Sequence, residues 1–251
     1  MRAIGIASAL SASLALTACG SPSYPSKTSV EGPITQDADG VWIFQPAGRP
    51  RSVVVFLHGQ GGPEETTPVN HRAWIDHLVE RGSIVVYARY ELAYERAALV
   101  HAVAGVRTAA ERVDLDGLPA LAIGYSRGAA LAVEYGAKAP GANVPVPAAV
   151  LSVFPSPQGD QSTVVDLRTL PHRTKVVFMV GQEDDVVGAQ GVRFFLRRLL
   201  VADFPPSRIR LRKVRSRGAF AAGHFAPMST SAVARAAFWH PADRLLRELE
   251  R

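Results

Sequence analysis

Apolar runs and amphipathic stretches alternate along most of this chain. Ser52–Leu57 (SVVVFL) is apolar at nearly every position, which is typical of a central strand buried on both faces. Residues 93–113 and 127–137 instead have helical spacing and many helix-favouring residues. Such alternation predicts an α/β fold with a mostly parallel central sheet and helices on both faces. The predicted strands are 41–45, 52–57, 83–87, 120–123, 148–154, 175–180 and 209–214, and the predicted helices are 74–81, 93–113, 127–137, 191–202 and 232–249, the last with a break near Pro241.

The N-terminal segment has a different character. A short basic start at Arg2 is followed by an apolar run up to Leu16 that is too short to span a bilayer. The run ends in Leu-Thr-Ala-Cys-Gly, which resembles the lipobox of bacterial lipoproteins and implies lipidation of Cys19. A plain secretory signal with an incidental cysteine is the alternative. Residues 1–18 are thus predicted to be a signal peptide, 19–36 a lipidated cysteine with a flexible Ser/Pro/Gly-rich tether, and 37–251 one domain in the bacterial cell envelope.

Composition and charge narrow the class of protein. The chain has 251 residues, 47% of them hydrophobic and 20% charged, as in an ordinary globular domain. The net charge is +6, and the densest basic cluster is Arg208, Arg210, Arg212, Lys213 and Arg215. These residues mostly alternate along a predicted strand, which favours an exposed solvated face over a nucleic-acid or anionic-surface binder. No nucleic-acid partner is therefore expected.

Ligands on parallel sheets bind at the carboxyl ends of the strands, so the residues there are the candidates for chemistry. Gly124-Tyr125-Ser126-Arg127-Gly128 lies between a predicted strand and an Ala-rich helix. This matches G-x-S-x-G, a strained turn that projects a serine hydroxyl above the sheet. The strand–turn–helix context favours a nucleophilic Ser126 over an ordinary serine in a tight turn.

An HG-rich loop, His58-Gly59-Gln60-Gly61-Gly62, follows the strand Ser52–Leu57. Glycines allow the backbone to curl until an N–H faces a substrate carbonyl. We expect the backbone N–H groups of Gln60 and Arg127 to form an oxyanion hole, and His58 to have a structural role. A phosphate-binding turn is disfavoured because neither G-x-G-x-x-G nor a following Lys-Ser/Thr is present.

Two further strand ends supply an acid and a base. Gly181-Gln182-Glu183-Asp184-Asp185 follows one strand, and the family spacing G-x-x-D-x-x-V favours Asp184 over Asp185, with Glu183 last. Gly223-His224-Phe225 follows the last strand. His224 is the expected base, and His240, next to Pro241, is the fallback.

Taken together, HGQGG, GYSRG, GQEDDVV and GHF resemble the α/β-hydrolase superfamily, in which the triad follows the chain order Ser, Asp, His. From about residue 41 onward, the chain is similar to compact members without a cap, such as dienelactone-hydrolase-like and carboxylesterase-like enzymes. The resemblance implies a serine hydrolase that cleaves esters through Ser126, His224 and Asp184, without metal or cofactor. Arg127 departs from the smaller or uncharged residues common after the nucleophile in this superfamily, and its charge is expected to alter the pocket.

The substrate remains open on this reading. The segment 155–174, where many relatives insert a cap, is short and contains Pro155, Pro157 and Gly159, which favours an open site for short or exposed esters. A peptidase or acyltransferase on the same scaffold, or a non-catalytic binding module, would be the alternatives. An intact triad and oxyanion loop favour the enzyme.

Overall fold

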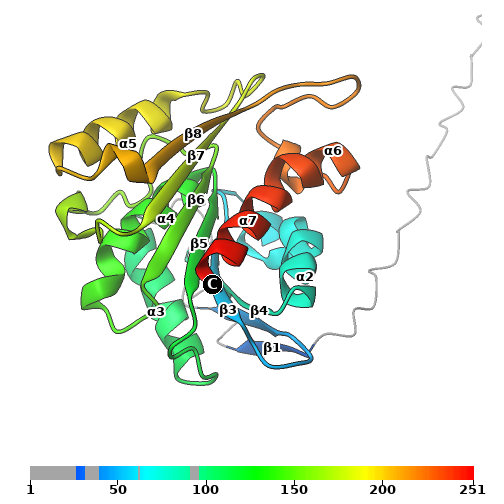
Figure 1. Ribbon diagram of the computed structural model, residues 1–251, viewed down its shortest axis with the longest axis vertical. Helices are drawn as coiled ribbons and strands as arrows, with labels where there is room; N and C mark the ends of the chain where they lie inside the picture. The colour runs from blue at the N-terminus through cyan, green and yellow to red at the C-terminus, as the bar shows by residue number, and fades with distance from the viewer. Residues whose placement is uncertain (1–26, 32–39, 62, 91–95) are drawn as a thin grey trace, which may run out of the picture.

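The computed structural model describes residues 27–31, 40–61, 63–90 and 96–251. Within these ranges, an eight-stranded sheet has the order β1-β2-β4-β3-β5-β6-β7-β8 (Figure 1). All neighbours from β4 onward in this order are parallel, while β2 is antiparallel to both β1 and β4. The strands are β1 Lys27–Glu31, β2 Val41–Gln45, β3 Ser52–Leu57, β4 Ser83–Ala88, β5 Ala120–Tyr125, β6 Pro147–Val153, β7 Lys175–Gly181 and β8 Ile209–Val214.

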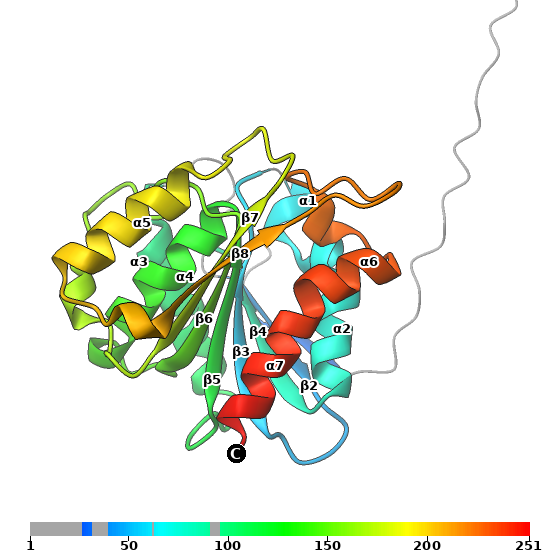
Figure 2. The same ribbon diagram turned by 45° about the horizontal axis from the view of Figure 1, so that its top comes forward.

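Helices cover both faces of this sheet (Figure 2). On one face, α3, α4 and α5 bury the side chains that β3 and β4 direct toward them; on the other, α2 and the C-terminal helices do so. All six residues of β3, β4 and β5 are buried, which explains their nearly unbroken apolar sequences. The helices are α1 Pro63–Thr66, α2 Arg72–Glu80, α3 Ala98–Ala110, α4 Arg127–Lys138, α5 Gln190–Val201, α6 Ala232–Ala234 and α7 His240–Leu249, with short 3₁₀ turns between several elements.

The fold class predicted from the sequence is confirmed: the described residues form a single α/β domain with a mostly parallel sheet, helices on both faces and no large cap. The segment 155–174 contains only the 3₁₀ turn Leu167–Thr169. The signal peptide, Cys19 and the start of the predicted tether lie outside the described residues. None of the helices described here is both long enough and apolar enough to cross a membrane.

Two local expectations need correction. Lys27–Glu31 falls within the predicted tether, yet it forms an edge strand along β2. Hydrogen bonding to an open sheet edge outweighs a loop-like composition that says nothing about tertiary partners. The predicted break near Pro241 is instead a π turn, Arg235–Trp239, inside a continuous helical run. Pro241 has no N–H to donate to the preceding turn, and the wider π turn lies directly before α7, where Pro241 is in the first turn.

Candidate active site

The turn between β5 and α4 has the geometry of a nucleophile elbow. Ser126 has φ 55° and ψ −119°, a region that residues with side chains rarely adopt. Its N–H donates to the carbonyl of Val153 at 2.9 Å, and its carbonyl accepts from the N–H of Ser156 at 3.1 Å. Such strain costs about 1–3 kcal/mol and persists only where the surrounding structure enforces it. The hydroxyl of Ser126 is thereby held at the carboxyl end of β5.

Glycines on both sides of the serine are required by close backbone approach. A Cβ atom on Gly124 would lie 2.0 Å from the carbonyl oxygen of Gly128. One on Gly128 would lie 2.1 Å from the carbonyl oxygen of Leu57. The G-x-S-x-G pattern therefore has a steric origin, because α4 starts in direct contact with β3 and β5.

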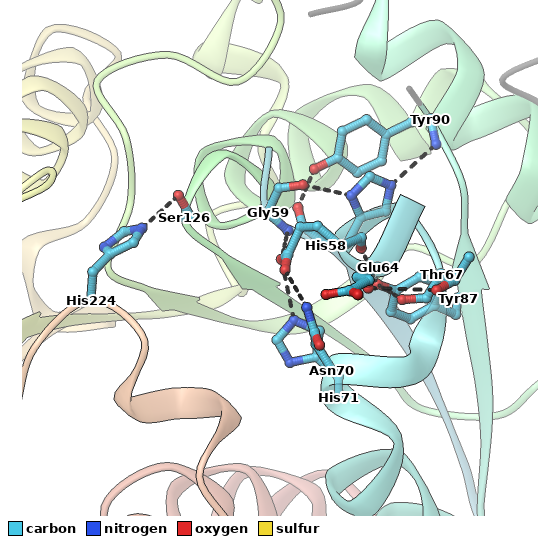
Figure 3. A network of polar contacts seen from close by, with 11 residues as sticks. His58, Gly59, Glu64, Thr67, Asn70, His71, Tyr87, Tyr90, Ser126 and His224 are labelled. Carbon is cyan, nitrogen blue, oxygen red and sulfur yellow. Dashed lines mark hydrogen bonds and ion pairs between the residues drawn. The ribbon is translucent and has the colours of Figure 1, made fainter. Parts of the chain in front are cut away.

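Ser126, His224 and Asp184 are brought together from three separate strand ends. His224 Nε2 lies 3.0 Å from Ser126 Oγ (Figure 3), and His224 Nδ1 lies 3.1 Å from each carboxylate oxygen of Asp184. Since a carboxylate only accepts, Nδ1 carries the proton and Nε2 is left to accept from the serine hydroxyl. Ser126, His224 and Asp184 thus form a continuous chain of hydrogen bonds.

The surroundings of Asp184 distinguish it from its two acidic neighbours. Its side chain is fully buried, and Oδ1 also accepts from the N–H groups of Val186 and Val187, each at 3.1 Å. Glu183 and Asp185 are exposed. His240, the fallback base, is exposed at the start of α7 and has no contact with Ser126. The structure therefore brings Asp184 and His224 to the serine.

Aromatic rings pack around the imidazole of His224. The ring of buried Tyr125 lies 5.2 Å from it between centroids, and that of Phe154 lies 6.3 Å away. Phe154 has φ 55°, an uncommon conformation for a bulky residue. Phe154 was not among the site residues predicted from the sequence. Its only signal was its position directly after a strand that neighbours β5.

The two residues whose N–H groups are expected to form the oxyanion hole follow adjacent strands. Gln60 follows β3, Arg127 begins α4 directly after β5, and β3 pairs with β5. The side chain of Arg127 is buried, whereas the sequence predicted that its charge would alter the substrate pocket. It is 1% exposed, and its Nε donates to the carbonyl of Gly159 at 2.7 Å. Arg127 therefore fastens the segment after β6 to the start of α4.

His58 lies behind the loop, away from Ser126, as its predicted structural role requires (Figure 3). Nδ1 lies 2.6 Å from the carbonyl of Gly59, so it donates, while Nε2 accepts from the N–H of Tyr90 at 3.5 Å. The Tyr90 ring stacks on the imidazole at 3.9 Å. Burial lowers the pKa of His58 to about 4, so the ring is neutral near pH 7.

Glu65 is a buried acid that the sequence analysis missed. Oε1 accepts from the N–H of Gly59 at 2.9 Å, and Oε2 accepts from the side-chain amide of Asn70 at 3.0 Å. His71 Nε2 lies 3.5 Å from Oε1. Burial raises the pKa of Glu65, but His71, Asn70 and the Gly59 N–H outweigh it, and the net pKa falls below its usual value. A charged Glu65 therefore fixes the residue that precedes Gln60.

Replacing Glu65 with alanine is expected to lower the free energy of unfolding by about 3 kcal/mol, because it leaves a buried N–H and a buried histidine without their acceptor. Glu65→Gln keeps one acceptor oxygen and should cost less. Urea denaturation measures both. Glu64→Ala, at an exposed neighbour, is the control and should stay within about 0.5 kcal/mol. A loss no larger than in this control would contradict the role of Glu65.

A second buried acid, Glu134 on α4, holds the segment after β6. Its Oε2 accepts from the N–H of Asp160 at 2.8 Å, and Arg198 lies 3.8 Å from Oε1. Burial raises the pKa of Glu134 to about 7, although the Asp160 N–H and Arg198 favour the charged form. Glu134 is therefore largely protonated below neutral pH.

This shift predicts a pH-dependent stability. Because the pKa of Glu134 is higher in the folded than in the unfolded chain, its contribution is complete below pH 4.5 and is lost as the pH rises through about 7. Glu134→Gln is neutral at every pH and keeps an acceptor oxygen. We expect it to match the parent at pH 5 and to exceed it at pH 8 by up to about 3 kcal/mol. Equal pH profiles for Glu134→Gln and the exposed control Glu111→Gln would refute this.

Comparison with solved structures places the fold. An inhibited esterase B of Lactobacillus rhamnosis superposes with a TM-score of 0.66 at 15% identity, covering 89% of this chain and 88% of the other. Carboxyl esterase 2 of Tuber melanosporum superposes with a TM-score of 0.64 at 17% sequence identity, covering 90% of this chain and 89% of the other. A dienelactone hydrolase of Anabaena variabilis superposes with a TM-score of 0.61 at 16% sequence identity, covering 91% of this chain and 100% of the other. The chain therefore has the α/β-hydrolase fold.

No protein-family model and no curated protein sequence matches the chain. Among the described residues, no three His, Cys, Asp or Glu side chains are grouped as metal ligands.

Proposed function

We propose that this protein is a serine hydrolase that cleaves carboxylic esters. The observation that carries the proposal is the chain of hydrogen bonds from Ser126 through His224 to buried Asp184, built on a strained strand-to-helix turn. A serine in an ordinary tight turn would need neither the histidine nor the buried acid. The fold shared with the two esterases agrees with this reading.

The arrangement supports acyl transfer in two stages. Ser126 Oγ attacks the ester carbonyl while His224 Nε2 takes its proton; His224 then gives the proton to the departing alcohol, leaving an acyl-serine. Water attacks that intermediate by the same route and releases the acid. Asp184 holds Nδ1–H and stabilises the positive imidazolium. The N–H groups of Gln60 and Arg127 are the proposed donors to the oxyanion, each contributing roughly 3–4 kcal/mol.

The substrate is proposed to be a short-chain or otherwise exposed ester. The support is the segment 155–174, which holds one 3₁₀ turn where a cap would be inserted. Hydrolysis of p-nitrophenyl acetate, butyrate and octanoate by the domain without residues 1–18 tests both reaction and substrate. Highest kcat/KM on the acetate or butyrate supports the proposal, and a preference for octanoate would contradict the open site. Absence of turnover together with absence of fluorophosphonate labelling would favour a non-catalytic role.

We also propose that Cys19 is lipidated and anchors the domain in the bacterial cell envelope. The support is the lipobox-like sequence up to Gly20. In a bacterial host, globomycin should block processing of the full chain. Processing that is unchanged by globomycin would refute lipidation.

A further inference from the structure

A basic groove runs along β8, the edge strand of the sheet, and has no part in the proposed reaction. It consists of two adjoining hollows. The larger, about 890 Å³, lies between β8 and α7 and is lined by Lys175, Arg208, Arg210, Arg212, Lys213 and Arg244. The smaller, about 270 Å³, shares Arg212 and Lys213 and adds Arg215 and Arg217. In both views, β8 runs beside the helical segment that ends in α7 (Figures 1 and 2).

Helix α7 packs on β5 and β6, and the hollow lies between α7 and the outer strands β7 and β8. Leu245 and Leu246 of α7 pack into the core on this face of the sheet. Val214 of β8 belongs to the same core cluster, and side chains alternate along a strand, so Arg210 and Arg212 point to this face as well. There they share the hollow with Arg244 of α7, beside the apolar side chains of Pro241 and Leu245.

The charge in this groove is almost entirely uncompensated. Glu248 is the single acid among the lining residues, and it is paired with Lys175 at 2.5 Å. None of the other seven cations has an ion pair with a carboxylate among the described residues. Arg212 and Arg244 are close enough that, besides burial, the charge of Arg244 lowers the pKa of Arg212. Arg212 and Arg244 are thus held close together, and Glu248, already paired with Lys175, is the one carboxylate that lines the same hollow.

The groove also accounts for the net charge of the chain. The sequence has 28 Lys and Arg against 22 Asp and Glu. Eight of these cations and one acid line the groove, so the rest of the chain is close to neutral. Charges on an edge strand also discourage pairing with other chains. That function would not require Arg244 on α7 or Lys175 on β7.

We propose that this groove binds a linear polyanion that carries phosphate groups. Six of the eight cations are arginines, whose planar guanidinium groups match phosphate oxygens in pairs. Cations on one face of a strand recur about every 6.6 Å, and β8 is about 20 Å long. A single small anion would contact only part of this row, whereas an extended chain of phosphates contacts all of it. The proposal does not depend on the proposed esterase activity.

The test uses the domain without residues 1–18 and long-chain inorganic polyphosphate as the probe, with binding measured by calorimetry from 50 to 300 mM salt. The groove variant is Arg210→Gln combined with Arg212→Gln. The matched control is Arg193→Gln with Arg197→Gln, which removes the same charge from exposed positions on α5. We expect the groove variant to bind at least roughly tenfold more weakly and to lose about two units of salt-dependence slope. The control should stay within about twofold.

Each outcome bears on the proposal. Equal loss in the two variants would show that overall charge governs binding, and no binding by the parent would show that the groove has another role; either overturns it. The parent could also bind phosphatidylglycerol vesicles but not polyphosphate, with vesicle binding lost only in the groove variant. That result would assign the groove to a lipid surface and overturn the proposal of a linear polyanion. An unchanged melting temperature for both variants shows that the comparison is between folded proteins.

Discussion

Replacing Ser126 with alanine is expected to lower kcat for p-nitrophenyl acetate by about 10⁴- to 10⁶-fold. The reason is that Ser126 Oγ is the atom proposed to attack the ester, and it is the hydroxyl that lies 3.0 Å from His224 Nε2. KM should change little, since the side chain removed is small. Any residual rate would come from the oxyanion donors acting on bound substrate and water.

The matched control is Ser156→Ala. Ser156 is also close to the elbow, but its hydroxyl donates to the carbonyl of Gln158, and only its backbone contacts Ser126. This variant should keep kcat within about threefold of the parent. A fluorophosphonate probe should label the parent and the control and leave Ser126→Ala unlabelled. Turnover by Ser126→Ala above about one hundredth of the parent rate would contradict the assignment of the nucleophile.

Replacing Asp184 with asparagine is expected to lower kcat by about 10³- to 10⁴-fold. An amide can donate its own N–H to His224 Nδ1, which would place the ring proton on Nε2, facing the serine. The histidine could then no longer accept the proton of Ser126. The buried charge that stabilises the imidazolium is lost as well.

Asp185→Asn is the control for this substitution, because it makes the same chemical change at the next residue. Asp185 is exposed, and His224 Nδ1 bonds Asp184 instead. The kcat of the Asp185→Asn variant should therefore stay within about twofold of the parent. Steady-state kinetics on both variants, with melting temperatures, separate a catalytic from a structural effect. A larger loss in Asp185→Asn than in Asp184→Asn would show that the acid had been misassigned.

The fold was largely predictable because its central strands have continuous apolar sequences. β3 carries the same limits in the predicted and observed structures, since six consecutive buried positions leave an apolar run that surface helices do not have. The glycines of the elbow were also predictable from the sequence. A Cβ atom at position 128 would lie 2.1 Å from the carbonyl oxygen of Leu57, so only glycine fits there. Edge elements were less readable: β1 forms by backbone pairing with β2, and its sequence KTSVE has no continuous apolar run.

Sequence alone therefore determined the α/β class, the position of the elbow, and the candidate residues at four strand ends, because these depend on periodicity and on short-range geometry. Only the tertiary structure decided which of three adjacent acids is buried against His224, since exposure is a property of the packed chain. It also decided that the Arg127 side chain is buried and bonded to the Gly159 carbonyl, that Glu65 holds Gly59, and that scattered arginines line one groove with Arg244. Each of these contacts joins residues far apart in the chain or depends on burial, which local sequence does not encode.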